Sequence, residues 1–262
     1  MKLLALDLDN TTLSLDGSIS PENRRAIEYV QNSGGYAVII TGRSPDAALP
    51  VWEMLPVHDI CSCFGGAVLT DMRKGEIIKS VSMSPVLLKK ALDIAHELGL
   101  VAQIYQGNKV ITEYENPYTD RYMKYLKLKE CIIEPDMRNM LFEDVVKVLC
   151  FTPESDLRSN ISVFENAFQG ELGISASGRS FIEINNPTVD KGTGLMSICK
   201  YLGVDIKDTV AMGDSLLDIP MIKSAGVGIA VQNAQDEVLK SADVISPDCD
   251  HDAVAWAVER WF

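Results

Sequence analysis

Two carboxylates stand two residues apart near the start of the sequence, directly after an apolar run. Asp7 and Asp9 follow residues 3–6, Leu-Leu-Ala-Leu. Like charges at this spacing repel each other, and burying either carboxylate without a partner is costly. A hard cation such as Mg²⁺ relieves the repulsion because it binds carboxylate oxygens, and an aspartate beside it can act as a nucleophile on phosphorus. The alternative is an acidic turn that only faces solvent.

A second acidic pair follows another predicted strand. Asp214 and Asp218 belong to the stretch GDSLLD, in which Gly213 permits a tight turn. In a parallel sheet, ligands gather beyond the carboxyl ends of the strands, so Asp214 is a candidate ligand for the same ion. The alternative is that an aspartate here only caps the helix predicted to follow.

Two further segments could bind an anion such as phosphate. Thr41, Gly42 and Arg43 follow a predicted strand, where a hydroxyl and backbone amides can bind phosphate oxygens, although the segment alone is ordinary turn sequence. Lys191 begins a predicted helix, at the end where the helix dipole disfavours a cation. This position indicates a nearby anion, and a surface lysine is the alternative.

The elements that must position these residues alternate between strands and helices at both ends of the chain, which is the pattern of a parallel sheet with helices on both faces. Residues 85–184 differ, because short strands, hairpin-like pairs and helices are mixed there. We therefore expect an α/β fold with a Rossmann-like core of residues 1–83 and 186–262 and an inserted α+β domain of residues 84–185. The predicted core strands are 3–7, 36–40, 59–63, 208–214, 225–231 and 243–246, with a hairpin at 66–70 and 76–80, and the predicted core helices are 20–35, 45–55, 191–203, 234–242 and 251–261.

Composition and charge limit the classes of molecule that this protein is expected to bind. The chain has 262 residues, of which 47% are hydrophobic and 23% charged, and a formal net charge of −13. Nucleic acids and anionic membranes bind basic faces, so neither is expected as a partner. No apolar run is long enough to span a bilayer and no signal peptide is recognisable, so we expect a cytoplasmic protein. The six cysteines lack metal-ligand spacing and predict buried, reduced thiols.

Four motifs in a fixed order resemble those of a known superfamily. They are DLDNTTL (7–13), ITGRS (40–44), VDKGTGL (189–195) and GDSLLD (213–218). Together they are similar to the motifs of the haloacid dehalogenase (HAD) superfamily. They are most similar to the Cof-type hydrolases, which carry a large α/β cap of the C2B type between the second and third motifs. The resemblance covers essentially the whole chain, including VQNAQDEV (231–238) and SADVISPDCDHDAVAWAVE (241–259).

The resemblance implies roles for the motif residues. Asp7 would be the nucleophile and Asp9 the general acid/base. A Mg²⁺ site would be formed by the Asp7 carboxylate, the Asp9 backbone carbonyl and Asp214. The residues implied to bind phosphate are Thr41, Gly42 and Lys191.

Four more residues are implied around this centre. Asp218 would support the metal ligands without binding the metal itself, and Asn233 would contact the surroundings of the phosphate or metal. Arg43 and Arg179 are candidates for substrate contact, and for each of them an ordinary surface position is the favoured alternative.

The chain departs from the usual Cof-type pattern at three places. Asn10 stands where glycine is usual, and asparagine also tolerates left-handed turn conformations. Gly65-Gly66-Ala67 stands where Asn-Gly-Ala is usual. Leu217 replaces an asparagine in the fourth motif, which removes one candidate contact near the metal.

The activity that the resemblance implies is Mg²⁺-dependent hydrolysis of small-molecule phosphate monoesters through an aspartyl-phosphate. Sugar phosphates are the first expectation for the substrate, and nucleotides and pyridoxal or flavin esters are open alternatives. Two other functions stand beside it: a sugar phosphomutase with the same nucleophile, and a non-catalytic sensor of a phosphorylated ligand. Leu217 favours the sensor, whereas the retained pair of Asp7 and Asp9 argues against it.

Overall fold

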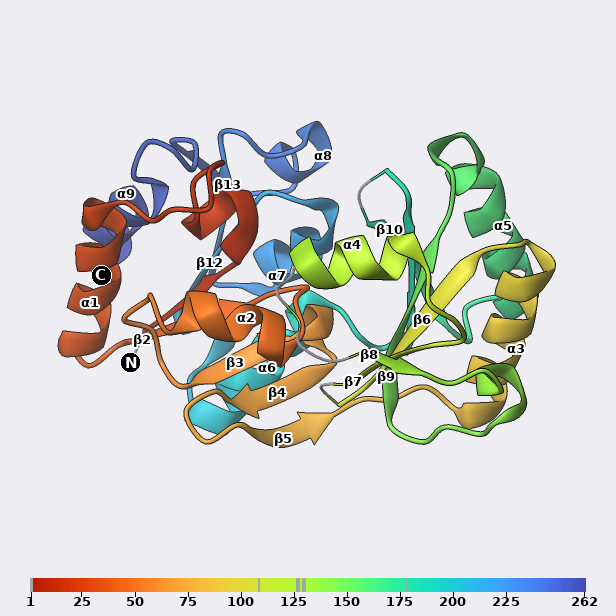
Figure 1. Ribbon diagram of the computed structural model, residues 1–262. Helices are drawn as coiled ribbons and strands as arrows, with labels where there is room; N and C mark the ends of the chain where they lie inside the picture. Colours follow the sequence, from red (N-terminus) through yellow and green to blue (C-terminus); the bar gives the residue numbers. More distant parts are fainter. Residues whose placement is uncertain (1, 108, 126–127, 129–130, 178) are drawn as a thin grey trace. The chain divides into compact units, whose positions relative to one another are not determined.

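The chain divides into two compact units, coloured along the sequence in Figure 1. The computed structural model describes residues 2–107, 109–125, 128, 131–177 and 179–262. The core unit comprises Met1–Lys79 and Asp190–Phe262, and the cap unit comprises Ser80–Val189. The domain boundaries expected from the sequence, 83/84 and 185/186, stay a prediction. Across the described ranges, no helix combines the length and the apolar character needed to cross a membrane.

The core unit is built on one eight-stranded sheet, which confirms the predicted α/β class. β1 lies between β2 and β12, and the strands from β14 to β3 run parallel. β4 runs antiparallel to β3, and the two edge strands are β5 and β14. In order across the sheet, the strands are β14 (Val244–Ser246), β13 (Val227–Val231), β12 (Thr209–Gly213), β1 (Leu3–Leu6), β2 (Tyr36–Ile40), β3 (Ile60–Cys63), β4 (Val68–Asp71) and β5 (Glu76–Ser80).

Burial on both faces explains why the central strands are apolar throughout. Every residue of β1 is buried. Leu3 and Ala5 belong to the same hydrophobic cluster as Leu195 and Ile198 of α6. A parallel strand covered on both faces has no polar side to expose, so its sequence lacks alternation. The core helices are α1 (Pro21–Asn32), α2 (Pro45–Trp52), α6 (Lys191–Leu202), α7 (Ile219–Ser224), α8 (Asp236–Leu239) and α9 (Ala253–Trp261).

Local capping explains some helix bounds, and a long-range contact explains one difference. Ser20 caps α1 as predicted, because its side chain accepts a hydrogen bond from Asn23 N. The helix predicted over 234–242 is shorter than expected. Gln235 N donates to Asp214 O at 3.1 Å, which holds Gln235 outside the helix, so α8 begins two residues later than predicted; it also ends three residues earlier.

All six cysteines are free thiols, as predicted. Cys61 and Cys63 lie on β3 with their sulfur atoms 3.6 Å apart, as expected for two residues on one face of a strand. Cys131 is the exception to the predicted burial, since it is only partly buried.

The cap unit is built on a six-stranded sheet. Its strands pair antiparallel except β7 and β8, which are parallel. One face packs against α3 and α5 through a cluster that includes Ile104, Val148 and Ile182. β8 has three residues, too few to show a strand pattern in the sequence. The strands in order are β10 (Gly173–Ser177), β11 (Phe181–Asn185), β9 (Val145–Phe151), β6 (Val101–Gln106), β7 (Lys109–Thr112) and β8 (Cys131–Ile133), and the helices are α3 (Pro85–Glu97), α4 (Pro117–Tyr125) and α5 (Leu157–Phe168).

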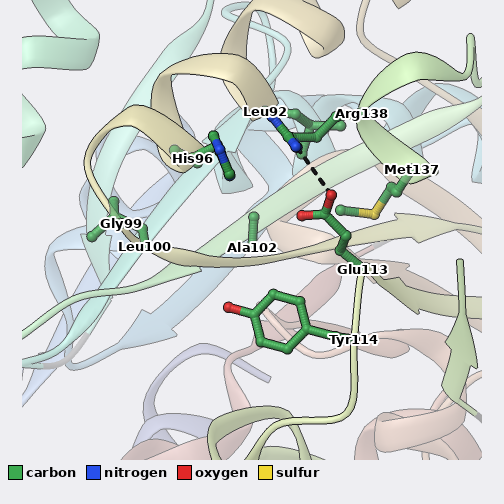
Figure 2. A pocket seen from close by; sticks show the side chains of 10 residues that line it. Leu92, His96, Gly99, Leu100, Ala102, Glu113, Tyr114, Met137 and Arg138 are labelled. Atoms are coloured by element: carbon green, nitrogen blue, oxygen red, sulfur yellow. Dashed lines mark hydrogen bonds and ion pairs between the residues drawn. The ribbon is translucent and has the colours of Figure 1, made fainter. Parts of the chain in front are cut away.

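One cavity of the cap unit, of about 480 Å³, lies beside α3 (Figure 2). Leu92 and Met137 contribute to its apolar lining. Arg138 Nε donates to Glu113 Oε1 at 3.0 Å within this cavity, so these two charged side chains are paired with each other. Tyr114 also lines the cavity and is half-exposed.

Candidate active site

The candidate site residues follow neighbouring parallel strands at their carboxyl ends. Leu6 of β1 lies opposite Met212 of β12 and Ile39 of β2. Asp7 therefore leaves β1 beside Asp214, which follows β12. Asp7 N donates to Met212 O at 3.1 Å, which extends the pairing by one residue. This edge is where open α/β sheets place ligands, because the chain leaves each strand there in a loop.

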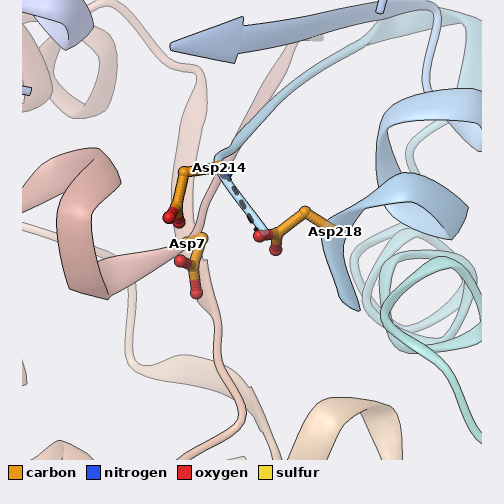
Figure 3. Close-up of side chains that lie close together, drawn as sticks. All are labelled: Asp7, Asp214 and Asp218. Atoms are coloured by element: carbon orange, nitrogen blue, oxygen red, sulfur yellow. Dashed lines mark hydrogen bonds between the residues drawn. The ribbon is translucent and has the colours of Figure 1, made fainter. Parts of the chain in front are cut away.

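Three aspartates form an acidic cluster at this edge (Figure 3). Asp7, Asp214 and Asp218 each offer a carboxylate oxygen, and these oxygens lie within 4.8 Å of one another. Asp7 and Asp218 are buried. Thr11 Oγ1 donates to Asp214 Oδ1 at 3.1 Å, which helps to orient the third carboxylate. The structure thus brings together aspartates from opposite ends of the sequence.

Lys191 joins two of these carboxylates. It is the first residue of α6, and its Nζ lies 2.6 Å from Asp7 Oδ1 and 2.5 Å from Asp218 Oδ1. The surface alternative is wrong for Lys191, which is buried. Burial alone would lower the pKa of Lys191, but the charges of Asp218 and Asp7 outweigh it and the pKa is raised. The position of Lys191 at the start of a helix indicated a nearby anion, and the carboxylates of Asp7 and Asp218 are two such anions.

Asp218 is held on both of its oxygens. Oδ1 accepts from Lys191. Oδ2 accepts from the backbone amides of Asp214 and Ser215 at 3.2 and 2.9 Å and from Ser215 Oγ at 2.7 Å. A carboxylate with this many donors shapes the turn that carries Asp214, in keeping with the supporting position implied by the resemblance.

Two glycines allow the close approaches on which the cluster depends. A Cβ atom at Gly213 would lie 2.3 Å from Asp218 Cβ, closer than any two such carbons can come. Gly66 has a φ of +110°, and a Cβ atom there would lie 2.1 Å from Asp190 O, at the start of α6. Glycine at both positions lets the backbone carrying Lys191 and Asp218 approach the sheet.

Burial and repulsion raise the pKa values of Asp7 and Asp214. Burial and the charge of Asp218 raise the pKa of Asp7 well above its usual range, by more than Lys191 lowers it. Burial is also the largest influence on Asp214, followed by Asp218, and the pKa of Asp214 is raised to about 6. Three carboxylates thus face a single ammonium group. A divalent cation that takes oxygen ligands would offset the excess negative charge, so these residues fit Mg²⁺.

Asp9 is oriented by Arg43. Arg43 Nε donates to Asp9 Oδ2 at 2.9 Å and Nη2 donates to Asp9 Oδ1 at 2.5 Å. Arg43 Nη1 donates to Ala47 O of α2 at 3.2 Å, which anchors the guanidinium. The Arg43 side chain is 20% exposed and that of Asp9 46%. Arg43 is therefore not an ordinary surface residue, because its guanidinium is paired with the Asp9 carboxylate.

The turn between Asp7 and Leu13 is irregular, and the side chain of Asn233 is hydrogen-bonded to it. Asn10 has a φ of +56°, the left-handed conformation that asparagine tolerates. Asn233 Nδ2 donates to Asn10 O at 2.8 Å, and Asn233 Oδ1 accepts from Cys249 N at 2.9 Å. Asn233 thus bridges two backbone segments next to the motif of Asp7.

The segment after β2 is held by backbone contacts. Thr41 N donates to Ser62 O at 2.9 Å, and Gly65 N donates to Thr41 O at 2.9 Å. The buried Thr41 hydroxyl accepts from Arg43 N at 3.2 Å. Gly42 lies between them, and its Cα has open space where a side chain would stand, with no atom within 4 Å. Thr41 and Gly42 are thus fixed where β2 ends.

Sequence reasoning missed two residues that hold the acidic cluster, Thr11 and Ser215. The available signal was their place inside the motifs, as hydroxyl residues next to aspartates. Leu217 is partly buried in the turn before α7. Arg179 lies in the cap unit, exposed and 3.7 Å from Glu154, which agrees with the surface alternative.

Comparisons with known proteins agree with the geometry. The haloacid dehalogenase-like hydrolase family matches residues 4–258. A 5-amino-6-(5-phospho-D-ribitylamino)uracil phosphatase of Bacillus subtilis is 30% identical over 100% of this chain and 96% of its own length. A pyridoxal phosphate phosphatase of Escherichia coli is 23% identical over 97% of this chain and 96% of its own length.

Solved structures show the same fold. A haloacid dehalogenase-like hydrolase from Bacteroides thetaiotaomicron matches with a TM-score of 0.87 and 27% identity, over 100% of this chain and 99% of the other. The chain therefore belongs to the haloacid dehalogenase-like hydrolase family, and it is a phosphoric monoester hydrolase of the Cof type.

Proposed function

We propose that this protein hydrolyses small-molecule phosphate monoesters through a phosphoryl group carried by Asp7, with Mg²⁺ as cofactor. The observation that carries the proposal is the difference in surroundings between two aspartates that are only two residues apart. Asp7 lies among carboxylates beside Lys191, whereas Asp9 turns its carboxylate to Arg43. These surroundings support attack by Asp7 and proton transfer by Asp9.

The reaction has two steps. In the first, the Asp7 carboxylate attacks phosphorus, the bond from phosphorus to the ester oxygen breaks, and that oxygen takes a proton from the Asp9 carboxyl group. In the second, Asp9 accepts a proton from water, the water oxygen attacks phosphorus, and inorganic phosphate leaves Asp7. The proton lent by Asp9 is recovered, so the enzyme returns to its starting state.

Charge stabilisation comes from residues around Asp7. We assign phosphate binding to Lys191, Thr41 and Gly42, because a cation, a hydroxyl and a backbone amide suit the phosphoryl oxygens. Asp7, the backbone carbonyl of Asp9 and Asp214 would hold the metal. When bound, Mg²⁺ supplies positive charge that offsets the charge on the transferred phosphoryl group.

Sugar phosphates remain our first proposal for the substrate. The relatives named above act on esters whose alcohol part carries a ring, a ribitylaminouracil in one case and pyridoxal in the other. These names support phosphorylated metabolites as the substrate class, and they keep heteroaromatic esters open as the alternative.

The experiment is a phosphate-release screen over a panel of sugar, nucleotide, pyridoxal and flavin phosphates, with and without Mg²⁺. We expect release that requires the metal and falls by about a thousandfold or more in Asp7→Asn. Asp16→Asn, an exposed aspartate nearby, is the control and should keep full activity. Full activity of Asp7→Asn would overturn the proposal, and conversion of a hexose phosphate into its isomer without release would support the mutase.

A further inference from the structure

A cavity of about 570 Å³ in the cap unit is lined by aromatic side chains. They come from two parts of the unit: Tyr118 and Tyr122 from α4, and Phe151 and Phe181 from the neighbouring strands β9 and β11. Arg121 stands at the same cavity. Neither the motifs nor the proposed catalytic cycle uses any of these residues.

The four rings touch one another in a connected set. Phe151 lies at its centre, with ring centroids 5.7 Å from Tyr118, 6.0 Å from Tyr122 and 5.3 Å from Phe181. Tyr118 and Phe151 are inclined by only 33°, whereas the two other contacts of Phe151 are edge-to-face. Arrangements of both kinds leave ring faces and ring edges available to a further ring.

These rings line a space and do not fill it. Phe151 is buried, but Tyr122 and Phe181 are only partly buried and Tyr118 is 49% exposed. Aromatic side chains that served only to pack α4 onto the sheet would close on each other, since protein interiors leave few voids larger than a water molecule. A lined cavity of this size with partly exposed rings instead suits a bound molecule.

The polar groups at the cavity favour a ring that carries heteroatoms. Arg121 Nε donates to Pro117 O at 3.1 Å, which holds its guanidinium 5.5 Å from the centroid of the Tyr118 ring. A cation in this position attracts electron-rich ring faces and carbonyl oxygens. Ser180 also lines the cavity and carries a hydroxyl group, whereas the Thr152 hydroxyl already accepts from Asn160 Nδ2 at 2.8 Å.

We propose that this cavity binds a flat heteroaromatic ring. Such a ring can stack on Tyr118 or Phe151 while its carbonyl or ring-nitrogen atoms meet Arg121 and the Ser180 hydroxyl group. The ring could belong to the alcohol part of a phosphate ester or to a separate effector, and both sources share this chemistry. The inference stands on the cap unit alone and does not depend on the proposed hydrolysis.

The test measures binding of riboflavin, uridine and pyridoxine, none of which carries a phosphate, to the whole protein by calorimetry. We expect at least one of them to bind, and Tyr118→Leu to weaken that binding about tenfold, the size expected for losing one stacked ring. Phe181→Leu should have a similar effect. Tyr114→Leu is the matched control, because Tyr114 is a half-exposed tyrosine of the same unit that lines the other cavity, and its Kd should not change.

Three results would overturn the inference. The first is that none of the three compounds binds. The second is that Tyr118→Leu, with an unchanged circular dichroism spectrum, binds them as tightly as the natural protein does. The third is that ribitol, which has no ring, competes for the site as well as they do.

The source of the ring is decided by kinetics with riboflavin 5′-phosphate and glycerol 3-phosphate. A ring in the alcohol part predicts that Tyr118→Leu shifts the ratio of their kcat/KM values about tenfold. An effector predicts that riboflavin changes turnover of glycerol 3-phosphate without competing with it. If no ester is hydrolysed, the proposed function fails while the binding result stands by itself.

Discussion

Arg43 holds both carboxylate oxygens of Asp9, at 2.9 and 2.5 Å, and is itself anchored to Ala47 O. The two side chains are 34 residues apart in the sequence, yet this pairing gives Asp9 an orientation separate from the neighbouring acidic cluster. A bidentate contact of this kind fixes direction as well as charge. We infer that Arg43 is a positioning residue for the proposed acid/base.

Replacement of Arg43 tests this role. Arg43→Met should lower kcat about tenfold with little change in KM, because a misdirected Asp9 loses part of the contribution of a general acid. Arg43→Lys should restore part of kcat. Steady-state kinetics of both variants measures this, with Arg25→Met as control, since Arg25 forms an exposed ion pair with Glu22. A raised KM with unchanged kcat would instead identify Arg43 as a substrate contact.

Lys191 should be essential for stability without metal. Lys191→Met leaves Asp7 and Asp218 buried and facing each other without a cation, so the free energy of unfolding should fall by about 3–5 kcal/mol. Urea unfolding in the presence of a chelator measures the change. Lys207→Met removes an exposed ion pair with Asp205 and should leave the free energy of unfolding nearly unchanged. Equal stabilities of the two variants would contradict the buried network.

Gly213 should not tolerate a side chain. Alanine would place a Cβ atom 2.3 Å from Asp218 Cβ, so Gly213→Ala should lower the free energy of unfolding by about 1–3 kcal/mol or more. Gly42→Ala is the matched control, because no atom lies within 4 Å of the added carbon and the backbone there is ordinary. Thermal unfolding compares the two, and an undisturbed Gly213→Ala variant would refute the close packing.

Two histidines should make opposite contributions to the pH dependence of stability. Burial lowers the pKa of His58, and its Nδ1 accepts from Ile60 N, so the unfolded chain binds a proton more readily at this residue. Its contribution to stability is therefore complete above the unfolded pKa of about 6.5 and is lost as the pH falls from there through the lowered pKa of the folded state. The pKa of His251 is raised by its hydrogen bond to Asp248, so its contribution is present at low pH and is lost as the pH rises.

Urea unfolding of His58→Asn and His251→Asn between about pH 5 and 8 checks this, around the usual histidine pKa. The loss of stability on acidification should become smaller in the first variant and larger in the second. The same change in both variants would contradict the assignment.

The core was predictable because its patterns are local. Continuous apolar runs identified β1 and β2, and Ser20 with Pro21 identified the start of α1. Where a distant contact decides the structure, as between Gln235 and Asp214 O, the local pattern extended a helix too far.

The acidic cluster was predictable in part, because carboxylates at the ends of parallel strands must share one edge of the sheet. The partner of each side chain was not. The sequence leaves open whether Arg43 faces solvent or Asp9, since tertiary packing decides which long side chains meet. The same holds for Thr11, whose neighbours in the sequence give no sign of its bond to Asp214.

The most direct measurement mixes the enzyme with an ester that it hydrolyses and quenches the reaction with acid during turnover. Mass spectrometry of the peptides then locates the phosphoryl group. We expect Asp7 to carry it and Asp7→Asn to lack it. With an aryl phosphate, whose leaving group needs no proton from Asp9, the phosphoryl group should accumulate in Asp9→Asn because only the attack of water is slowed. A phosphoryl group on any other residue, or none on Asp7 while Asp9→Asn still consumes ester, would contradict the account.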